Sequence, residues 1–256
     1  MKLTFLGTAT SYGVPFVACD CAVCTSENPR NKRLRASVFI ETAKARILVD
    51  TSPDLRTQLL RENIREIFAV FWTHAHNDHI IGLDDLRPIC NKIGYIPGFA
   101  DADTSDNLRR VFAYAFVPNQ EANFPRITLH TLEPLETVEI GDIRVTPLSI
   151  CHGKRAIFAY RFQTQNRVLV YATDCSHIPE VSREAMRNAD VLVLGALRHQ
   201  SHPAHFTVGE ALREVEDLQP KRAFFTHIGH ELEHDETNAI LPPNVRLAFD
   251  GLKMEL

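Results

Sequence analysis

The sequence lacks the features that place a protein in or on a membrane. No stretch of its 256 residues approaches the roughly 18 uninterrupted apolar residues of a transmembrane helix. Residues 1–7 are strand-like and contain no signal-peptide core. We therefore expect no membrane partner and a cytoplasmic location.

A basic arm is also missing. The 28 Lys and Arg residues are scattered along the chain, and with 32 Asp and Glu residues they leave a formal net charge of −4. This charge balance argues against a dedicated nucleic-acid surface. A nucleic-acid partner is therefore the less favoured alternative to a small substrate.

Six cysteines are unevenly distributed along the chain. Cys19, Cys21 and Cys24 lie within six positions of one another. In a reducing compartment such a cluster indicates a metal more often than disulfides. The other three are isolated and are expected to be small core residues: Cys90, Cys151 and Cys175.

The chain is long enough for a large core, and 45% of its residues are hydrophobic. Strand patterns occur over residues 2–6, 37–41, 45–50, 143–150, 156–162, 168–172, 191–194 and 222–225. Helical patterns occur over residues 54–62, 180–188 and 208–218, and another helix begins at residue 84. Strands in each half with helices between them predict two sheets packed inside outer helices. Without a visible repeat or linker, residues 1–256 are expected to form a single domain.

Two segments depart from this alternation. Residues 7–35 are a long polar loop, which needs its own means of ordering. Residues 92–125 are typical of an insertion, with a helix over 103–116 and several aromatic rings. Most of these rings are expected to pack the insertion down, and the rest would line a substrate mouth. The sequence leaves open whether the insertion is a substrate lid or a dimer contact, and whether the chain forms a homodimer.

The densest chemical signal is a histidine-rich loop after an apolar run over residues 67–72. The run is short, aromatic and β-branched, and it predicts a buried strand. His74 and His76 lie where this strand ends, and the following turn presents Asp78 and His79. A polar loop that caps a strand is the alternative. Four ligand-type residues at this spacing favour a metal site.

Three later strands also end in metal-capable residues. His152 follows the strand over 143–150, Asp174 follows 168–172, and His227 follows 222–225. Taken singly, each residue is more typical of a hydrogen-bonded polar group at the edge of a core. The repetition of a ligand at the carboxyl end of a strand favours one shared metal site.

With these residues the chain resembles the metallo-β-lactamase-fold hydrolases, whose signature loop and later ligand positions it matches. The resemblance implies an αββα sandwich of two mixed β-sheets flanked by helices. It also implies two divalent metal ions at one edge, with zinc, manganese and iron all compatible with the ligands. The implied ligands are His74, His76 and His152 for the first ion, Asp78, His79 and His227 for the second, and Asp174 as the bridge.

A closer resemblance is to the phosphoribosyl 1,2-cyclic phosphate phosphodiesterases, the PhnP-like branch. It rests on Gly-Thr-Ala-Thr-Ser-Tyr-Gly-Val-Pro over 7–15 before the Cys-x-Cys-x-x-Cys motif, Thr-His-Ile-Gly-His over 226–230, and His205 before a helix. It implies a phosphodiesterase that opens a small cyclic phosphate with a metal-activated hydroxide. The alternatives are a ribonuclease Z-like endonuclease and a metal-binding accessory or redox protein of cofactor biosynthesis.

The cysteine cluster and His230 are expected to bind a separate structural zinc. Three thiolates and one imidazole complete a tetrahedral zinc and leave no open position for chemistry. His230 lies three residues after the ligand His227. A zinc held by Cys19, Cys21, Cys24 and His230 would therefore fasten the N-terminal loop beside the active site.

Asp78 is expected to be catalytic as well as a metal ligand. Four residues that are not metal ligands are also expected in or around the active site. His205 is the expected general acid, because an imidazole with a pKa of about 6.5 can donate a proton at neutral pH, and His202 is its rival. Asp50 is expected to orient a ligand imidazole. Lys154, two residues beyond a ligand, is expected either to contact a substrate phosphate or to lie in solvent.

Overall fold

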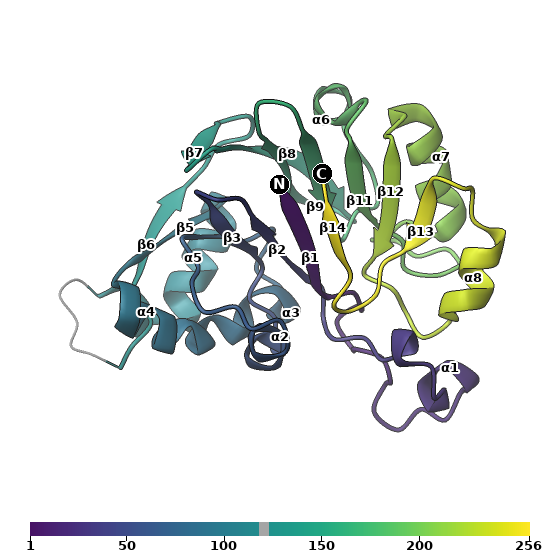
Figure 1. The fold of residues 1–256 in the computed structure, drawn as a ribbon, viewed down its shortest axis with the longest axis horizontal. Coiled ribbons are helices and arrows are strands. Elements are labelled where there is room, and N and C mark those ends of the chain that lie inside the picture. Colours follow the sequence, from purple (N-terminus) through teal and green to yellow (C-terminus); the bar gives the residue numbers. More distant parts are fainter. Residues whose placement is uncertain (118–122) are drawn as a thin grey trace.

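The computed structural model describes residues 1–117 and 123–256, so the part of the expected insertion over 118–122 lies outside the described residues. Within that range the chain forms two seven-stranded sheets that pack face to face, with helices on their outer faces (Figure 1). Both sheets are mixed, and the expected αββα sandwich is confirmed. None of the described helices is long and apolar enough to cross a membrane.

The first sheet is antiparallel on one side and parallel on the other. Its spatial order is β14 (Lys253–Glu255), β1 (Lys2–Gly7), β2 (Ser37–Glu41), β3 (Arg46–Val49), β4 (Ala69–Phe71), β5 (Ile96–Ala100) and β6 (Ile127–Thr131). The pairs from β14 to β3 are antiparallel, and those from β3 to β6 are parallel. Parallel neighbours need crossover connections. Helices in these crossovers are α2 (Leu55–Arg61), α3 (Asn77–Ile80), α4 (Arg87–Ile93) and α5 (Ala102–Val111).

The second sheet repeats this division. Its spatial order is β13 (Val245–Leu247), β12 (Arg222–Thr226), β11 (Val191–Gly195), β10 (Val168–Ala172), β9 (Arg155–Gln163), β8 (Ile143–His152) and β7 (Val138–Ile140). The pairs from β10 to β13 are parallel. Their crossovers contain α6 (Glu180–Met186), α7 (Val208–Leu218) and α8 (His234–Ile240). A capping box between Thr207 and Glu210 fixes the start of α7.

Three apolar layers hold the sandwich together. The central layer lies between the sheets and includes Phe5, Phe71 and Tyr160, and the two outer layers join each sheet to its helices. Each fully buried large side chain contributes about 1.5–3 kcal/mol relative to exposure. Two hydrogen bonds also join the second sheet to the segment after β4. The Tyr160 hydroxyl donates to the Trp72 carbonyl at 2.7 Å, and the Phe158 N–H donates to the Thr73 carbonyl at 3.0 Å. These ties lie immediately beside the histidine-rich loop.

The two unusual segments are both built into the fold. Residues 96–100 of the expected insertion form β5, which pairs with β4 and β6 inside the first sheet. The expected helix over 103–116 is α5 followed by the 3₁₀ turn η3 (Ala113–Phe116). The long N-terminal loop contains α1 (Ala22–Thr25) and the 3₁₀ turn η1 (Pro29–Asn31). It reaches toward the side of the molecule that carries β12 and α8 (Figure 1).

Candidate metal centre

The structure brings the seven predicted active-site ligands together in two groups that share one aspartate. Within each group the potential ligand atoms all lie within 4.8 Å of one another. All seven side chains are buried except that of His76, which is partly exposed. The groups are His74, His76, His152 and Asp174, and Asp78, His79, Asp174 and His227. Asp174 therefore occupies the position expected of a bridge.

Sharp turns at three strand ends aim side chains toward this edge. Asp50 follows β3 with a φ of 63°, Asp174 follows β10 with 49°, and His227 follows β12 with 55°. L-residues rarely adopt this left-handed conformation, and each instance costs about 1–3 kcal/mol. Such strain persists only where the surrounding structure fixes it, and three instances at one edge indicate a functional site.

Hydrogen bonds fix the orientation of three ligand imidazoles. His79 Nδ1 donates to Asp50 Oδ2 at 2.8 Å, and His152 Nδ1 donates to the Ala204 carbonyl at 2.8 Å. His74 Nδ1 lies 3.0 Å from the Thr73 hydroxyl, which also contacts Asp50. The Nε2 of each ring then faces the other ligands, and that of His74 lies 2.9 Å from His76 Nδ1. Such second hydrogen bonds to ligand imidazoles are the usual arrangement around a metal. Asp50 therefore lies where it can orient His79, and Thr73, which contacts both Asp50 and His74, was not singled out from the sequence.

The pKa values of the buried ligand side chains indicate a site that favours positive charge. Burial favours the neutral form of the Asp174 carboxyl, but the imidazoles of His227 and His79 outweigh this and lower its pKa well below the usual range. Burial also lowers the pKa of His79, but Asp78, Asp174 and Asp50 outweigh it and raise this pKa well above the usual range. The carboxyls of Asp78 and Asp174, whose pKa values are both lowered, therefore create a strong demand for positive charge, which divalent cations can supply.

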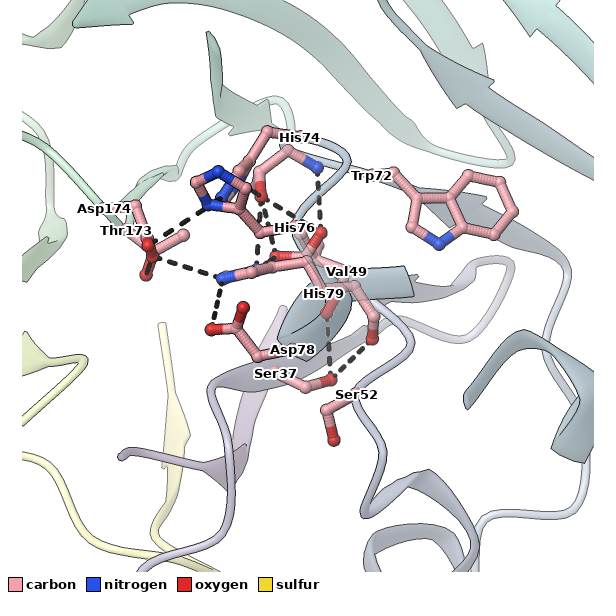
Figure 2. Close-up of polar contacts among 12 residues, drawn as sticks. Ser37, Val49, Ser52, Trp72, His74, His76, Asp78, His79, Thr173 and Asp174 are labelled. Atoms are coloured by element: carbon pink, nitrogen blue, oxygen red, sulfur yellow. Dashed lines mark hydrogen bonds and ion pairs between the residues drawn. The ribbon is translucent and has the colours of Figure 1, made fainter. Parts of the chain in front are cut away.

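The spacing of the second group also fits metal ligation. His79 Nε2 lies 3.1 Å from Asp78 Oδ2 and 3.4 Å from Asp174 Oδ1 (Figure 2). His227 Nε2 lies 3.2 Å from Asp174 Oδ2. Neither imidazole nitrogen has a hydrogen-bond partner of acceptable geometry among the described residues. Donor atoms about 2.0–2.2 Å from one ion lie about 2.9–3.5 Å from each other. The atoms thus converge on a common point instead of on one another.

A pocket of about 370 Å³ opens over both groups. His205 lies in it, with its ring centroid 4.7 Å from that of His152 and 4.8 Å from that of His227, so it adjoins ligands of both groups. It belongs to neither group. Burial, followed by the charge of His227, lowers the pKa of His205 to about 3. The ordinary imidazole pKa assumed from the sequence therefore does not apply to this site.

The other predicted substrate residues differ in their placement. His202 lines the pocket, and its ring lies 4.9 Å from that of His205. Lys154 is exposed and is not among the residues that line the pocket. It follows Gly153 in the two-residue turn between β8 and β9, where His152 pairs with Arg155. The lysine therefore lies at a hairpin tip.

The aromatic wall of the pocket comes from an unexpected segment. None of the described residues in the expected insertion over 92–125 lines this pocket, whereas Tyr12 and Phe16 of the N-terminal loop do. Arg198 and Glu231 also line it, and sequence reasoning had not singled them out. The available signals were weak: Tyr12 lies within the glycine-flanked motif over 7–15, and Arg198 begins the histidine-rich loop before α7.

The three clustered cysteines lie close to His230, which is near the C-terminal end of the chain. Its Nδ1 lies 3.2 Å from the sulfur of Cys19 and 3.5 Å from those of Cys21 and Cys24. One imidazole nitrogen carries at most one proton, so it cannot donate to three sulfurs. In tetrahedral zinc, with bonds of about 2.3 Å to sulfur and 2.0 Å to nitrogen, such ligands lie about 3.5 Å apart. The four atoms therefore have the spacing of a zinc site.

Other contacts hold the N-terminal loop against the segment after His227. The buried Arg33 donates to the carbonyls of Gly229 and Leu232 at 3.1 and 2.8 Å. The Phe16 ring stacks on that of His230, with centroids 3.9 Å apart. Because His230 is close in sequence to His227, these contacts connect the loop directly to the ligand groups.

Comparisons with known proteins give a family match and a similar solved structure. Residues 45–228 match the model of the beta-lactamase superfamily domain. A solved structure described as a new diphosphatase from the PhnP family is 41% identical, with a TM-score of 0.92, and the match covers 100% of this chain and 97% of that one. The chain is therefore similar to that structure over its whole length.

Two curated relatives are longer than the chain. The octanoyltransferase of Porphyromonas gingivalis is 35% identical over 256 residues, which cover 99% of this chain and 51% of the relative. The ribonuclease Z of Thermosynechococcus vestitus is 28% identical over 169 residues, which cover 65% of this chain and 38% of the relative. The chain thus spans about half or less of the length of these proteins.

Proposed function

The chain belongs to the β-lactamase superfamily, in its PhnP-like branch, and we propose that it is a metal-dependent phosphodiesterase acting on a small cyclic phosphate. The substrate would be phosphoribosyl 1,2-cyclic phosphate or a similar ester. The observation that carries the proposal is the pair of ligand groups sharing Asp174 at a pocket. Similarity to a PhnP-family diphosphatase supports hydrolysis at phosphorus.

The two groups fit a pair of divalent ions, with zinc, manganese or iron compatible with imidazole and carboxylate ligands. Such ions would lower the pKa of a water molecule and polarise phosphoryl oxygens. Asp174 would hold both ions at a fixed separation, and Asp78 would join it in balancing their charge. Asp50 and Thr73 would keep the ligand rings in position during the reaction.

The remaining pocket residues would bind the substrate and assist departure of the leaving group. Arg198 is the sole Lys or Arg among the described residues that line the pocket, and its guanidinium suits a phosphoryl oxygen. His205 would donate a proton to the leaving oxygen, with His202 as the alternative donor. Neither histidine belongs to a ligand group, so both stay available to the substrate.

The dimensions of the pocket favour a small substrate. About 370 Å³ lies at the lower end of the range for ligand sites. A wall with one Lys or Arg among its described residues is also poorly suited to a long polyanion, whose binding depends on many phosphate contacts. The match to ribonuclease Z makes an endonuclease the second candidate, and the fold is common to both.

Purified, metal-loaded protein should be tested on ribose cyclic phosphates, linear phosphodiesters, a nucleoside diphosphate ester and a tRNA precursor. We expect the cyclic phosphates to be hydrolysed fastest. Cleavage of the tRNA precursor alone would replace the proposal with the endonuclease. Hydrolysis of the diphosphate ester alone would show that the enzyme cleaves a phosphoanhydride bond instead of a phosphate ester bond.

We further propose that Cys19, Cys21, Cys24 and His230 hold a structural zinc. Hydrogen bonding from the Cys24 N–H lowers the pKa of the Cys21 thiol to about 7, which favours the thiolate that zinc binds. Burial raises the pKa of the Cys24 thiol to about 11, so the charge of the ion itself would have to stabilise that thiolate. This zinc clip, made by the four residues together, would join Cys24 and His230, which are 206 positions apart. Treated as a cross-link over that span, it contributes at most roughly 5 kcal/mol to the free energy of unfolding.

Replacing Cys21 with serine should therefore remove about one zinc per chain and lower the melting temperature by on the order of 10 °C. Metal analysis and thermal unfolding measure the two effects, and cobalt substitution should give thiolate charge-transfer bands in the unaltered protein. Cys90→Ala is the matched control, because this buried thiol lies outside the cluster and its loss should leave the zinc content unchanged. Unchanged zinc content in Cys21→Ser would rule out the clip.

A further inference from the structure

His227 differs from three other histidine ligands in how its ring is held. The rings of His74, His79 and His152 each have a hydrogen-bonding contact at Nδ1. Neither ring nitrogen of His227 has a hydrogen-bond partner among the described residues. Its φ of 55° is also one that L-residues rarely adopt. The position of this ligand therefore depends on the backbone that flanks it.

The backbone beside His227 is held by the segment that follows β1. The Ile228 N–H donates to the Thr8 carbonyl at 2.8 Å, and the Thr10 N–H donates to the Ile228 carbonyl at 3.2 Å. Thr8 and Ile228 are both fully buried. Thr8 follows a strand of the first sheet, whereas His227 follows a strand of the second. A ligand on one sheet is therefore fixed against a residue of the other.

Asp250 fixes Thr8 in turn. It lies in the connection from β13 to β14, where the chain passes from the second sheet to the first, and only 8% of its side chain is exposed (Figure 1). The Thr8 hydroxyl donates to Asp250 Oδ1 at 2.8 Å, and the Leu34 N–H donates to Oδ2 at 2.8 Å. Because the Thr8 N–H donates to the Leu34 carbonyl at 2.9 Å, both bonds of the carboxylate hold the same piece of backbone.

The carboxyl of Asp250 carries a charge that strengthens these bonds. Burial raises its pKa to about 6, although hydrogen bonds from Leu34 and Thr8 oppose this shift, so the group is mostly ionised at neutral pH. Hydrogen bonds to an ionised acceptor are roughly twice as strong as neutral ones. Asp250 lies outside both ligand groups and does not line the pocket. Its contacts therefore indicate a role that is exerted through Thr8.

We propose that Asp250 is a positioning residue for the metal centre: through Thr8 it fixes the backbone at Ile228 and thereby the place of His227 at the second ion. This inference rests on the proposed function, because it requires that His227 binds an ion. Asp250 itself would contact neither the ion nor the substrate. Its loss would displace one ligand of the second group and leave the three histidines of the first group in place.

Binding of Mn²⁺ should be measured by calorimetry on protein that keeps zinc at the cysteine cluster, because thiolates select zinc whereas imidazole and carboxylate ligands accept manganese. We expect two binding steps in the unaltered protein. Thr8→Val removes the hydroxyl at nearly constant volume and should weaken one step by about 10- to 100-fold, the usual effect of losing an outer partner of a metal ligand. The other step should be almost unchanged. Asp250→Asn should act in the same way, and Thr8→Ser, which keeps the hydroxyl, should restore the affinity.

A double-mutant cycle distinguishes positioning from a general loss of stability. His227→Ala should weaken the same step, and Thr8→Val should cost no further affinity in that background, because the ligand that it positions is already absent. Glu62→Gln is the matched control, since 6% of the Glu62 side chain is exposed and its ion pairs go to Arg61 and Lys253. It should leave both steps unchanged. Additive losses in the double variant, equal weakening of both steps in Thr8→Val, or loss of an ion in Glu62→Gln would overturn the inference.

The same measurement separates this inference from the proposed reaction. The expected pattern of Mn²⁺ binding in a protein that hydrolyses no phosphodiester would support the role of Asp250 and refute only the activity. Hydrolysis by the unaltered protein, combined with unchanged Mn²⁺ binding in Thr8→Val and Asp250→Asn, would refute the role of Asp250 and leave the activity standing. Failure of the unaltered protein to bind two ions would overturn both.

Discussion

Replacing Asp174 with asparagine is expected to reduce activity by about 10³-fold or more, because this carboxylate is common to both ligand groups. Asparagine is the informative substitution. Asp174 has a φ of 49°, a conformation that asparagine tolerates and alanine does not, so Asp174→Asn removes the charge without adding backbone strain. The bound metal should fall from two active-site ions per chain to one or fewer. Metal analysis and steady-state kinetics measure the two effects.

Asp190 provides a matched control at the opposite end of the same sheet. It precedes β11, accepts from the Val168 N–H at 2.8 Å and pairs with Lys221 at 2.8 Å. Asp190→Asn should therefore lower stability slightly and leave the active-site metal unchanged. If Asp174→Asn retained both ions and near-normal turnover, the ligand assignment would be wrong. If Asp190→Asn also lost metal, the loss would reflect a general weakening of the second sheet.

The ligand positions were accessible from the sequence because each follows an apolar run. A strand that ends in a polar residue is visible as a pattern, and the carboxyl ends of parallel strands meet at one edge of a sheet. His152, Asp174 and His227 were found in this way, and the structure brings them together with the loop over 74–79. Asp50 was found for the same reason, since it directly follows β3.

Apart from His202 and His205, the loop residues of the pocket wall were not predicted from the sequence, because their side-chain directions follow no periodicity. Tyr12 and Arg198 enter the pocket through tertiary contacts of the N-terminal loop and the loop before α7. Lys154 illustrates the converse. Its distance in sequence from His152 is short, but the hairpin turn at Gly153, with a φ of 61°, places it at a tip.

The strand β5 was not predicted from the sequence because of its composition. Pro97 and Gly98 are both disfavoured inside strands, so this stretch resembled part of an insertion. In the structure, a Cβ on Gly98 would lie 2.6 Å from the Trp72 ring. The glycine is therefore required for Trp72 to pack across β5, and this tertiary demand outweighs the local propensity.

Replacing His205 with alanine should lower kcat by about 10²–10⁴-fold on a substrate with a poor, alkoxide-type leaving group. The expectation rests on its position between His152 and His227, outside both ligand groups. Burial lowers its pKa to about 3, so the negative charge of a bound phosphoryl group is needed to favour a proton on the ring. Active-site metal content should be unchanged.

Leaving-group dependence distinguishes proton donation from substrate positioning. A nitrophenyl phosphodiester expels a stable anion without protonation, so His205→Ala should affect its hydrolysis much less. His202→Ala tests the neighbouring ring of the pocket, and His199→Ala is the control, because His199 is exposed in the same loop and does not line the pocket. Equal losses on both classes of leaving group would make His205 a positioning residue. A leaving-group-dependent loss confined to His202→Ala would transfer the proton-donor role to that ring, 4.9 Å away.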